Sequence, residues 1–100
     1  MEKKECSVAI QMLPQVAEEG VIPIVDEVIA YIKSLGLPMV VGPFETTVEG
    51  SFDALMDMVK QCQLICIKAG APSLLSYVKI HYAPHKGVWS IAEKTDKHHG

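Results

Sequence analysis

The sequence predicts one α+β domain, in which two helices cover one face of a four-stranded antiparallel sheet. Apolar and polar residues alternate over four short segments, and apolar residues recur at helical spacing over two longer ones. These segments follow one another as strand, helix, strand, strand, helix, strand. A chain of 100 residues has the length of a single domain, so residues 1–100 are expected to share one core.

The first strand is expected over residues 5–13, because apolar residues occupy every second position there. The side chains predicted to face the core are Cys6, Val8, Ile10 and Met12. Pro14 ends this strand, and the Glu-Glu-Gly run at residues 18–20 is expected to form a loop.

The first helix is predicted over residues 23–35, where apolar residues recur at helical spacing. Pro23 is favourable at the first helical position, where its missing N–H is not needed. Gly36 can adopt the left-handed conformation that caps a helix, and Pro38 prevents the helix from continuing.

Two short strands are expected next, over residues 37–42 and 44–49, with a turn at Gly42 and Pro43. The second of these strands separates its side chains between two faces. Phe44, Thr46 and Val48 are predicted to face the core, and Glu45, Thr47 and Glu49 the opposite side. Two carboxylates and a hydroxyl in a row are not needed for folding, so these side chains are expected to face solvent or to contact a ligand or a partner.

The second helix is predicted over residues 52–69, with Ser51 as its N-cap, Asp53 in its first turn and Gly70 as its stop. Its apolar stripe consists of Phe52, Leu55, Val59, Cys62, Cys66 and Ala69, and it is widened by Met56 and Met58. The two cysteines could serve metal or redox chemistry, but their place on the apolar stripe favours core packing.

Residues 74–82 alternate again and form the predicted fourth strand, and a capping-box pattern predicts a short helix over residues 91–97. The order βαββαβ is the split βαβ, or ferredoxin-like, plan. The expected strand order is 4-1-3-2, with the first and third strands central and parallel. Val78 and Ile80 are then expected to pack beneath the helices.

The face of the sheet that the helices leave open is expected to be mixed in character. Its predicted members are Ser7, Ala9, Gln11, Leu13, Glu45, Thr47, Glu49, Tyr77, Lys79 and His81. Lys79 is expected to lie too far from Glu49 for direct pairing within one subunit, since strands two apart are separated by ~10 Å. This face is a solvated surface, a subunit interface, or a ligand site at such an interface.

Composition argues against several classes of function. A net charge of −3 with nine Lys and Arg residues does not favour nucleic acid, and no apolar run approaches the ~20 residues of a membrane span. No secretory signal is recognised, and three cysteines without a disulfide pattern indicate a reducing, cytoplasmic setting. The histidines lack metal-ligand spacing and no catalytic motif occurs, so neither a metal site nor an enzyme is expected.

A family resemblance is carried by residues 45–50, of sequence ETTVEG, followed by Asp53. This segment resembles the T-x-x-E-G-x-x-D signature of the thiamine-binding protein family, small ferredoxin-like proteins of about this length. Residues 10–14 resemble that family's first strand, and residues 91–94 its C-terminal helix. The chain differs from many members in carrying Ser73 beside the position of an arginine, and residues 81–84 in place of an Asp-Asp-Arg-Arg-like run.

The resemblance implies a βαββαβ fold and assembly into dimers that pair into a homotetramer. It also implies a cytoplasmic, non-enzymatic role in binding thiamine or its hydroxymethylpyrimidine part, with no cofactor. The candidate ligand-binding residues are Gln11, Glu45, Thr46, Thr47, Glu49, Tyr77 and Lys79.

The chemistry of such a ligand suits side chains of the open face. A carboxylate, Glu45 or Glu49, can offset the positive thiazolium ring. Gln11 and Thr47 offer hydrogen-bonding groups to an aminopyrimidine, and Tyr77 can stack on a ring. Two alternatives remain: a self-associating structural or regulatory module with no small-molecule ligand, and an enzyme that uses one of the two carboxylates as its base.

Overall fold

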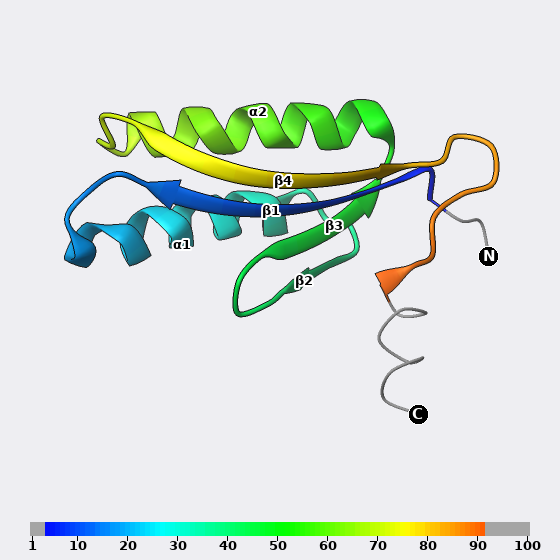
Figure 1. Ribbon diagram of the computed structural model, residues 1–100, viewed down its shortest axis with the longest axis horizontal. Helices are drawn as coiled ribbons and strands as arrows, with labels where there is room; N and C mark the ends of the chain where they lie inside the picture. The colour runs from blue at the N-terminus through cyan, green and yellow to red at the C-terminus, as the bar shows by residue number, and fades with distance from the viewer. Residues whose placement is uncertain (1–3, 92–100) are drawn as a thin grey trace.

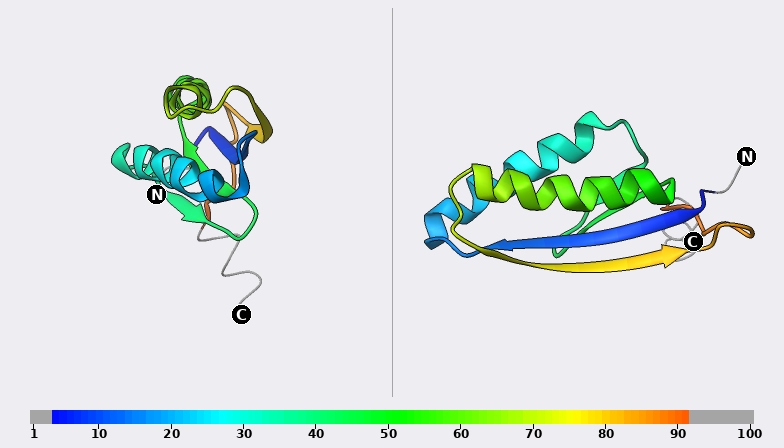
Figure 2. Two further views of the ribbon diagram at one scale, coloured as in Figure 1. Left: turned by 90° about the vertical axis from the view of Figure 1, so that its left-hand side faces the viewer. Right: turned by 90° about the horizontal axis from the view of Figure 1, so that it is seen from above.

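The computed structural model describes residues 4–91, which form two layers, a pair of helices and an antiparallel sheet (Figure 1). The elements in chain order are β1 (Cys6–Pro14), α1 (Glu18–Ser34), β2 (Met39–Val41), β3 (Thr46–Gly50), α2 (Phe52–Lys68) and β4 (Leu74–Tyr82). Both helices lie on the same side of the sheet (Figure 2). The predicted α+β class, with two helices and four antiparallel strands, is therefore confirmed.

The strands lie side by side in the order β2-β3-β1-β4, which is the expected order counted from the other edge. Every neighbouring pair is antiparallel, including the central pair β1 and β3. The expectation that these two strands run parallel is wrong. The first helix returns the chain so that β1 and β2 point the same way, and the β2–β3 hairpin then reverses β3 relative to both.

Helix α1 begins at Glu18, so the loop predicted for residues 18–20 is the helix's first turn. The two acidic side chains there stabilise the helix, because they lie at the positive end of its dipole. Pro23 lies inside the helix, where it cannot donate to the carbonyl of Glu19. Both residues are exposed, so water can take the place of the missing donor.

The β2–β3 hairpin turns later than the sequence pattern predicts. The Gly42 N–H donates to the Glu45 carbonyl over 2.9 Å, which makes residues 42–45 the turn and leaves Thr46 as the first residue of β3. Phe44 is therefore outside the strand and 78% exposed, so the prediction that it faces the core is wrong. Thr46 and Val48 are buried as predicted.

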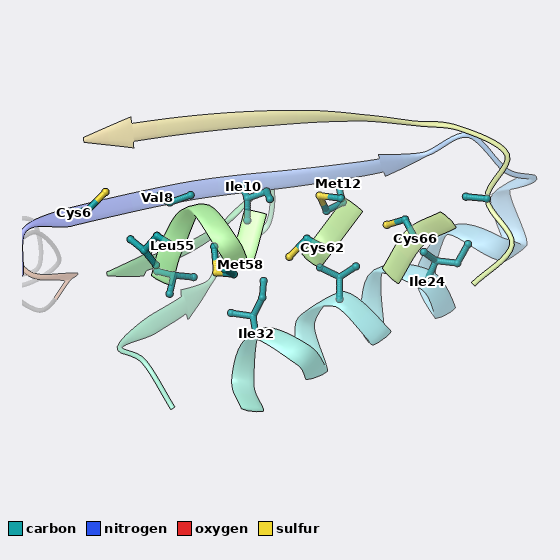
Figure 3. Packing of buried hydrophobic residues seen from close by; sticks show 13 residues of the cluster. Cys6, Val8, Ile10, Met12, Ile24, Ile32, Leu55, Met58, Cys62 and Cys66 are labelled. Carbon is teal, nitrogen blue, oxygen red and sulfur yellow. The ribbon is translucent and has the colours of Figure 1, made fainter. Parts of the chain in front are cut away.

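The core lies between β1 and the two helices (Figure 3). Its fully buried side chains include Val8, Leu55, Met58, Cys62 and Cys66, which confirms the core-packing interpretation of the two cysteines. Burial raises the pKa of the Cys62 thiol to about 12, because a thiolate there would lose its hydration. Both cysteines are therefore held as uncharged, apolar side chains.

Helix α2 begins and ends close to where the sequence predicts. The Ser51 hydroxyl accepts the Ala54 N–H over 3.2 Å, and the chain leaves the helix through Gly70 with φ 110°. Phe52, the first residue of α2 and of its apolar stripe, stacks on Tyr82 of the edge strand β4, with ring centroids 4.4 Å apart. Ile80 is half-exposed rather than packed beneath the helices, because β4 is an edge strand.

The chain after β4 turns back toward the start of β1 (Figure 1, orange). Two backbone bonds hold it there, from the Ala83 N–H to the Glu5 carbonyl (2.8 Å) and from the Val88 N–H to the Lys4 carbonyl (2.9 Å). Val88 is buried. We call residues 83–91 the return segment. The helix predicted over residues 91–97 lies, apart from Ile91, outside the described residues.

Candidate functional site

The face of the sheet away from the helices carries the side chains that strand alternation assigns to it. The rows across the strands are Glu49–Ser7–His81, Thr47–Ala9–Lys79 and Gln11–Tyr77. Because directly opposed residues of neighbouring strands point to the same side, each row is shared by one face. The register thus brings most of the candidate residues together on a single surface.

An ion pair crosses this face. The Lys79 Nζ lies 3.4 Å from a carboxylate oxygen of Glu45, and the two side chains reach each other over β1, the strand between them. Ala9 lies directly beside Lys79 on that strand and its small side chain leaves room for the contact. Lys79 is 76% exposed, so the pair contributes at most ~1 kcal/mol. A ligand could therefore replace Lys79 as the partner of Glu45 at little cost.

A shallow hollow of about 290 Å³ lies beside this ion pair. It is lined by Ser7, Ala9, Glu45, Thr47, Lys79, Ile80 and His81, and we call it the outer hollow. Its lining combines small side chains with a carboxylate and an ammonium. This arrangement suits a small polar or charged molecule.

Glu49 does not lie open on this face, contrary to the prediction. It is only 5% exposed, and its carboxylate accepts the N–H of Ile91 over 3.0 Å. The neighbouring Ser7 is buried as well. Glu49 therefore holds the return segment against the sheet, and in this conformation its carboxylate is engaged by the protein itself.

The remaining candidates lie apart from the outer hollow. Tyr77 is 59% exposed and stands beside the half-buried Gln11, whereas Thr46 is buried and faces the helices. Gln11 and Thr46 instead line a second, more enclosed hollow of about 150 Å³, between α1, β1 and the hairpin turn. We call it the inner niche, and it is lined by Ile10, Gln11, Met12, Val25, Val28, Ile29, Ile32 and residues 41–46.

Glu45 is the residue common to both hollows. It precedes β3, and its carbonyl closes the hairpin turn, so its position depends on the turn rather than on strand pairing. The sequence pattern did not identify the inner niche. The turn predicted at residues 42–43 was the one feature of the sequence that pointed to the niche. The niche is also formed by α1, whose position beside the hairpin the sequence pattern does not reveal.

Within residues 4–91, no three His, Cys, Asp or Glu side chains converge in a way that could hold a metal ion. The helices described there are also too short or too polar to cross a membrane.

The fold and these hollows define a class: a small ferredoxin-like protein with two hollows that share Glu45 in their lining. The chain belongs to the thiamine-binding protein family, whose sequence profile matches residues 8–99. The resemblance stated from residues 45–53 is thereby confirmed.

Relatives with the same architecture cover nearly the whole chain. A UPF0045 protein of Clostridium perfringens is 45% identical over 93% of this chain and 96% of its own length. A domain of unknown function from Bacillus cereus is 37% identical, with a TM-score of 0.85 over 95% of this chain and 90% of its own. A Thermotoga maritima protein, provisionally named for thiamine biosynthesis or salvage, is 32% identical, with a TM-score of 0.83 over 93% of this chain and 97% of its own.

Proposed function

We propose that this protein binds thiamine or its hydroxymethylpyrimidine part in the cytoplasm, without catalysing a reaction. Membership of the thiamine-binding protein family supports a ligand of this class. The single structural observation that carries the proposal is the position of Glu45, which lines both the inner niche and the outer hollow. A molecule with two linked rings, one of them cationic, suits two hollows that share a carboxylate.

The positive charge of thiamine matches the charge of the group that Glu45 pairs with in the structure, the Lys79 ammonium. Its present partner, Lys79, is an exposed ammonium on a flexible stem and contributes little to stability. A thiazolium ring that entered the outer hollow would bring the same charge to the same carboxylate and would leave Lys79 free to extend into water. Thr47 lines that hollow and could add a hydroxyl contact.

Self-association belongs to the same proposal. The exposed sheet face carries Leu75 and Tyr77, which are 56% and 59% exposed. Small two-layer proteins commonly cover such a face with a second copy, and we propose a homotetramer built as a dimer of dimers. Neither nucleic acid nor a membrane is proposed as a partner.

Isothermal titration with thiamine, and separately with hydroxymethylpyrimidine, tests this function. We expect saturable binding that weakens by about tenfold or more for thiamine in Glu45→Gln, because a charge-assisted contact is lost. Glu27→Gln is the matched control, since it makes the same change on an exposed position of α1.

Absence of heat from both ligands, at protein concentrations far above micromolar, would contradict the proposal. An oligomer in light scattering together with no binding would favour the self-associating module without a ligand. Turnover of a thiamine phosphate or pyrimidine phosphate would favour an enzyme instead.

A further inference from the structure

The edge of β1 that faces β3 has no strand partner at Met12. Backbone groups of Glu49 and Glu45 face β2, because the Glu49 N–H donates to the Pro38 carbonyl and the Glu45 carbonyl accepts the Gly42 N–H. The alternate residues of β3 therefore face β1, with Thr46 opposite Ile10 as the last pair. By the same alternation, the N–H and C=O of Met12 point to the β3 side of β1.

On the β3 side of β1, no strand continues beside Met12; its partner on the other side is Ser76 of β4. The antiparallel partner of Met12 on the β3 side would be Phe44, but there the chain is in the hairpin turn, and no backbone bond joins these two residues. The backbone N–H and C=O of Met12 thus have no partner among the described backbone groups, although the residue is only 7% exposed. Backbone groups without a protein partner are uncommon in a residue with so little exposure, and they indicate a binding position for water or another molecule.

The inner niche lies at this strand edge. Met12 lines it together with Val25 and Ile29 of α1 and with residues of the hairpin turn. Its volume of about 150 Å³ is comparable to that of an engineered apolar cavity that accommodates benzene. The niche therefore combines room for one six-membered ring with a donor and an acceptor from a single backbone position.

We propose that the inner niche binds an aminopyrimidine ring edge-on to β1, with the Met12 N–H donating to a ring nitrogen and the Met12 C=O accepting from the amino group. The inference rests on the proposed function and deepens it, because it assigns the two halves of the ligand to different hollows. The aliphatic side chains of α1 contact the faces of the ring. The ring occupies the position beside Met12 where Phe44 would pair if β3 continued to that residue.

Glu45 gives this niche a preference for an amino group over a carbonyl. An amino group has a second N–H, which can be donated to the carboxylate of Glu45, a residue that lines the niche. A pyrimidinone places a carbonyl oxygen at that position, where it would face the negative charge of Glu45. The amino and carbonyl forms of one pyrimidine are therefore expected to bind with clearly different affinities.

Nuclear magnetic resonance of the full ¹⁵N-labelled chain tests the inference at the backbone atom itself. Hydroxymethylpyrimidine and thiamine are each expected to shift the Met12 amide resonance and to slow its hydrogen exchange by about tenfold or more. The 4-oxo pyrimidine and the isolated thiazole should leave both nearly unchanged. A variant that fills the niche, Val25→Phe, should abolish the pyrimidine response, whereas Ile22→Phe, an exposed change on the same helix, should retain it.

The possible outcomes separate this inference from the proposed function. Thiamine binding without any change at Met12 would overturn the inner niche and leave the function standing. A Met12 response to the pyrimidine without thiamine binding would support the niche and overturn thiamine as the ligand. No response and no binding with either molecule would overturn both. Because the Met12 measurement is made on the unaltered chain, it decides the matter even where Val25→Phe does not fold.

Discussion

Replacing Glu49 with alanine is expected to release the return segment and to lower the stability of the domain. Glu49 is 5% exposed, and its carboxylate accepts the backbone N–H of Ile91 over 3.0 Å. A hydrogen bond to a charged group contributes ~1.5–3 kcal/mol, and a bond between neutral groups ~1 kcal/mol. We therefore expect Glu49→Ala to lower the free energy of unfolding by about 2 kcal/mol, and Glu49→Gln, which keeps an acceptor oxygen, by about half as much.

Two measurements check this expectation. Urea denaturation at one fixed protein concentration gives the change in the free energy of unfolding, and the exposed Glu27→Gln should change it by less than ~0.5 kcal/mol. Hydrogen exchange followed by mass spectrometry should show faster exchange in a peptide that spans residues 84–91, because the amides of Val88 and Ile91 lose their anchor.

One result would refute the reasoning. If Glu49→Ala left the denaturation midpoint and the exchange of residues 84–91 unchanged, Glu49 would not anchor the return segment. If the same variant also lost thiamine binding, the carboxylate would face the ligand, as the alternation of β3 first indicated. Loss of stability with retained thiamine affinity in Glu49→Gln would assign Glu49 to the fold and leave Glu45 as the ligand carboxylate.

Three further outcomes are expected. The Cys62 thiol should resist alkylation in the folded protein at pH 8 and react after unfolding, because burial raises its pKa to about 12. Since the pKa of the folded state lies above that of the unfolded state, the free energy of unfolding should fall as the pH rises above 9 toward 12. Denaturation at several alkaline pH values measures this fall. Ser51→Ala removes the N-cap of α2 and should lower the free energy of unfolding by ~1 kcal/mol. Lys79→Ala should change stability by less than ~1 kcal/mol but should strengthen thiamine binding in titration, because Glu45 loses its competing partner.

Local signals allowed much of the fold to be predicted. Helix α2 was located to within a residue because Ser51 and Gly70 flank a regular apolar stripe, and both act as the sequence indicates. β4 was found over its full length because its alternation is uninterrupted. The start of α1 was placed too late, since Pro23 suits a first helical turn and also tolerates an exposed position inside a helix.

The same signals failed where a contact joins distant parts of the chain. Alternation correctly assigned Glu49 to the side of the sheet opposite the core, but it carries no information about which segment covers that side. The return segment that covers it is 42 residues further along the chain. Phe44 was placed in the core because the turn was expected to end at Pro43, whereas the Gly42–Glu45 hydrogen bond extends it.

Two carboxylates near the ends of β3, Glu45 and Glu49, have different surroundings, which supports a binding role for Glu45 and a structural role for Glu49. Glu45 and Glu49 were predicted to share the same face and the same chemistry, and only their neighbours distinguish them. Glu49 lies at the end of β3 beside the return segment, which donates an N–H to it and excludes water. Glu45 lies at the other end, before pairing begins, where the chain turns and β3 no longer pairs with β1 beyond Ile10. The early end of β3 therefore has two effects at once: it leaves Glu45 accessible from two hollows, and it leaves the Met12 backbone unpaired beside it. Extending β3 to Phe44 would remove both features. A longer hairpin strand is therefore expected to make the fold more regular and to abolish the proposed ligand binding.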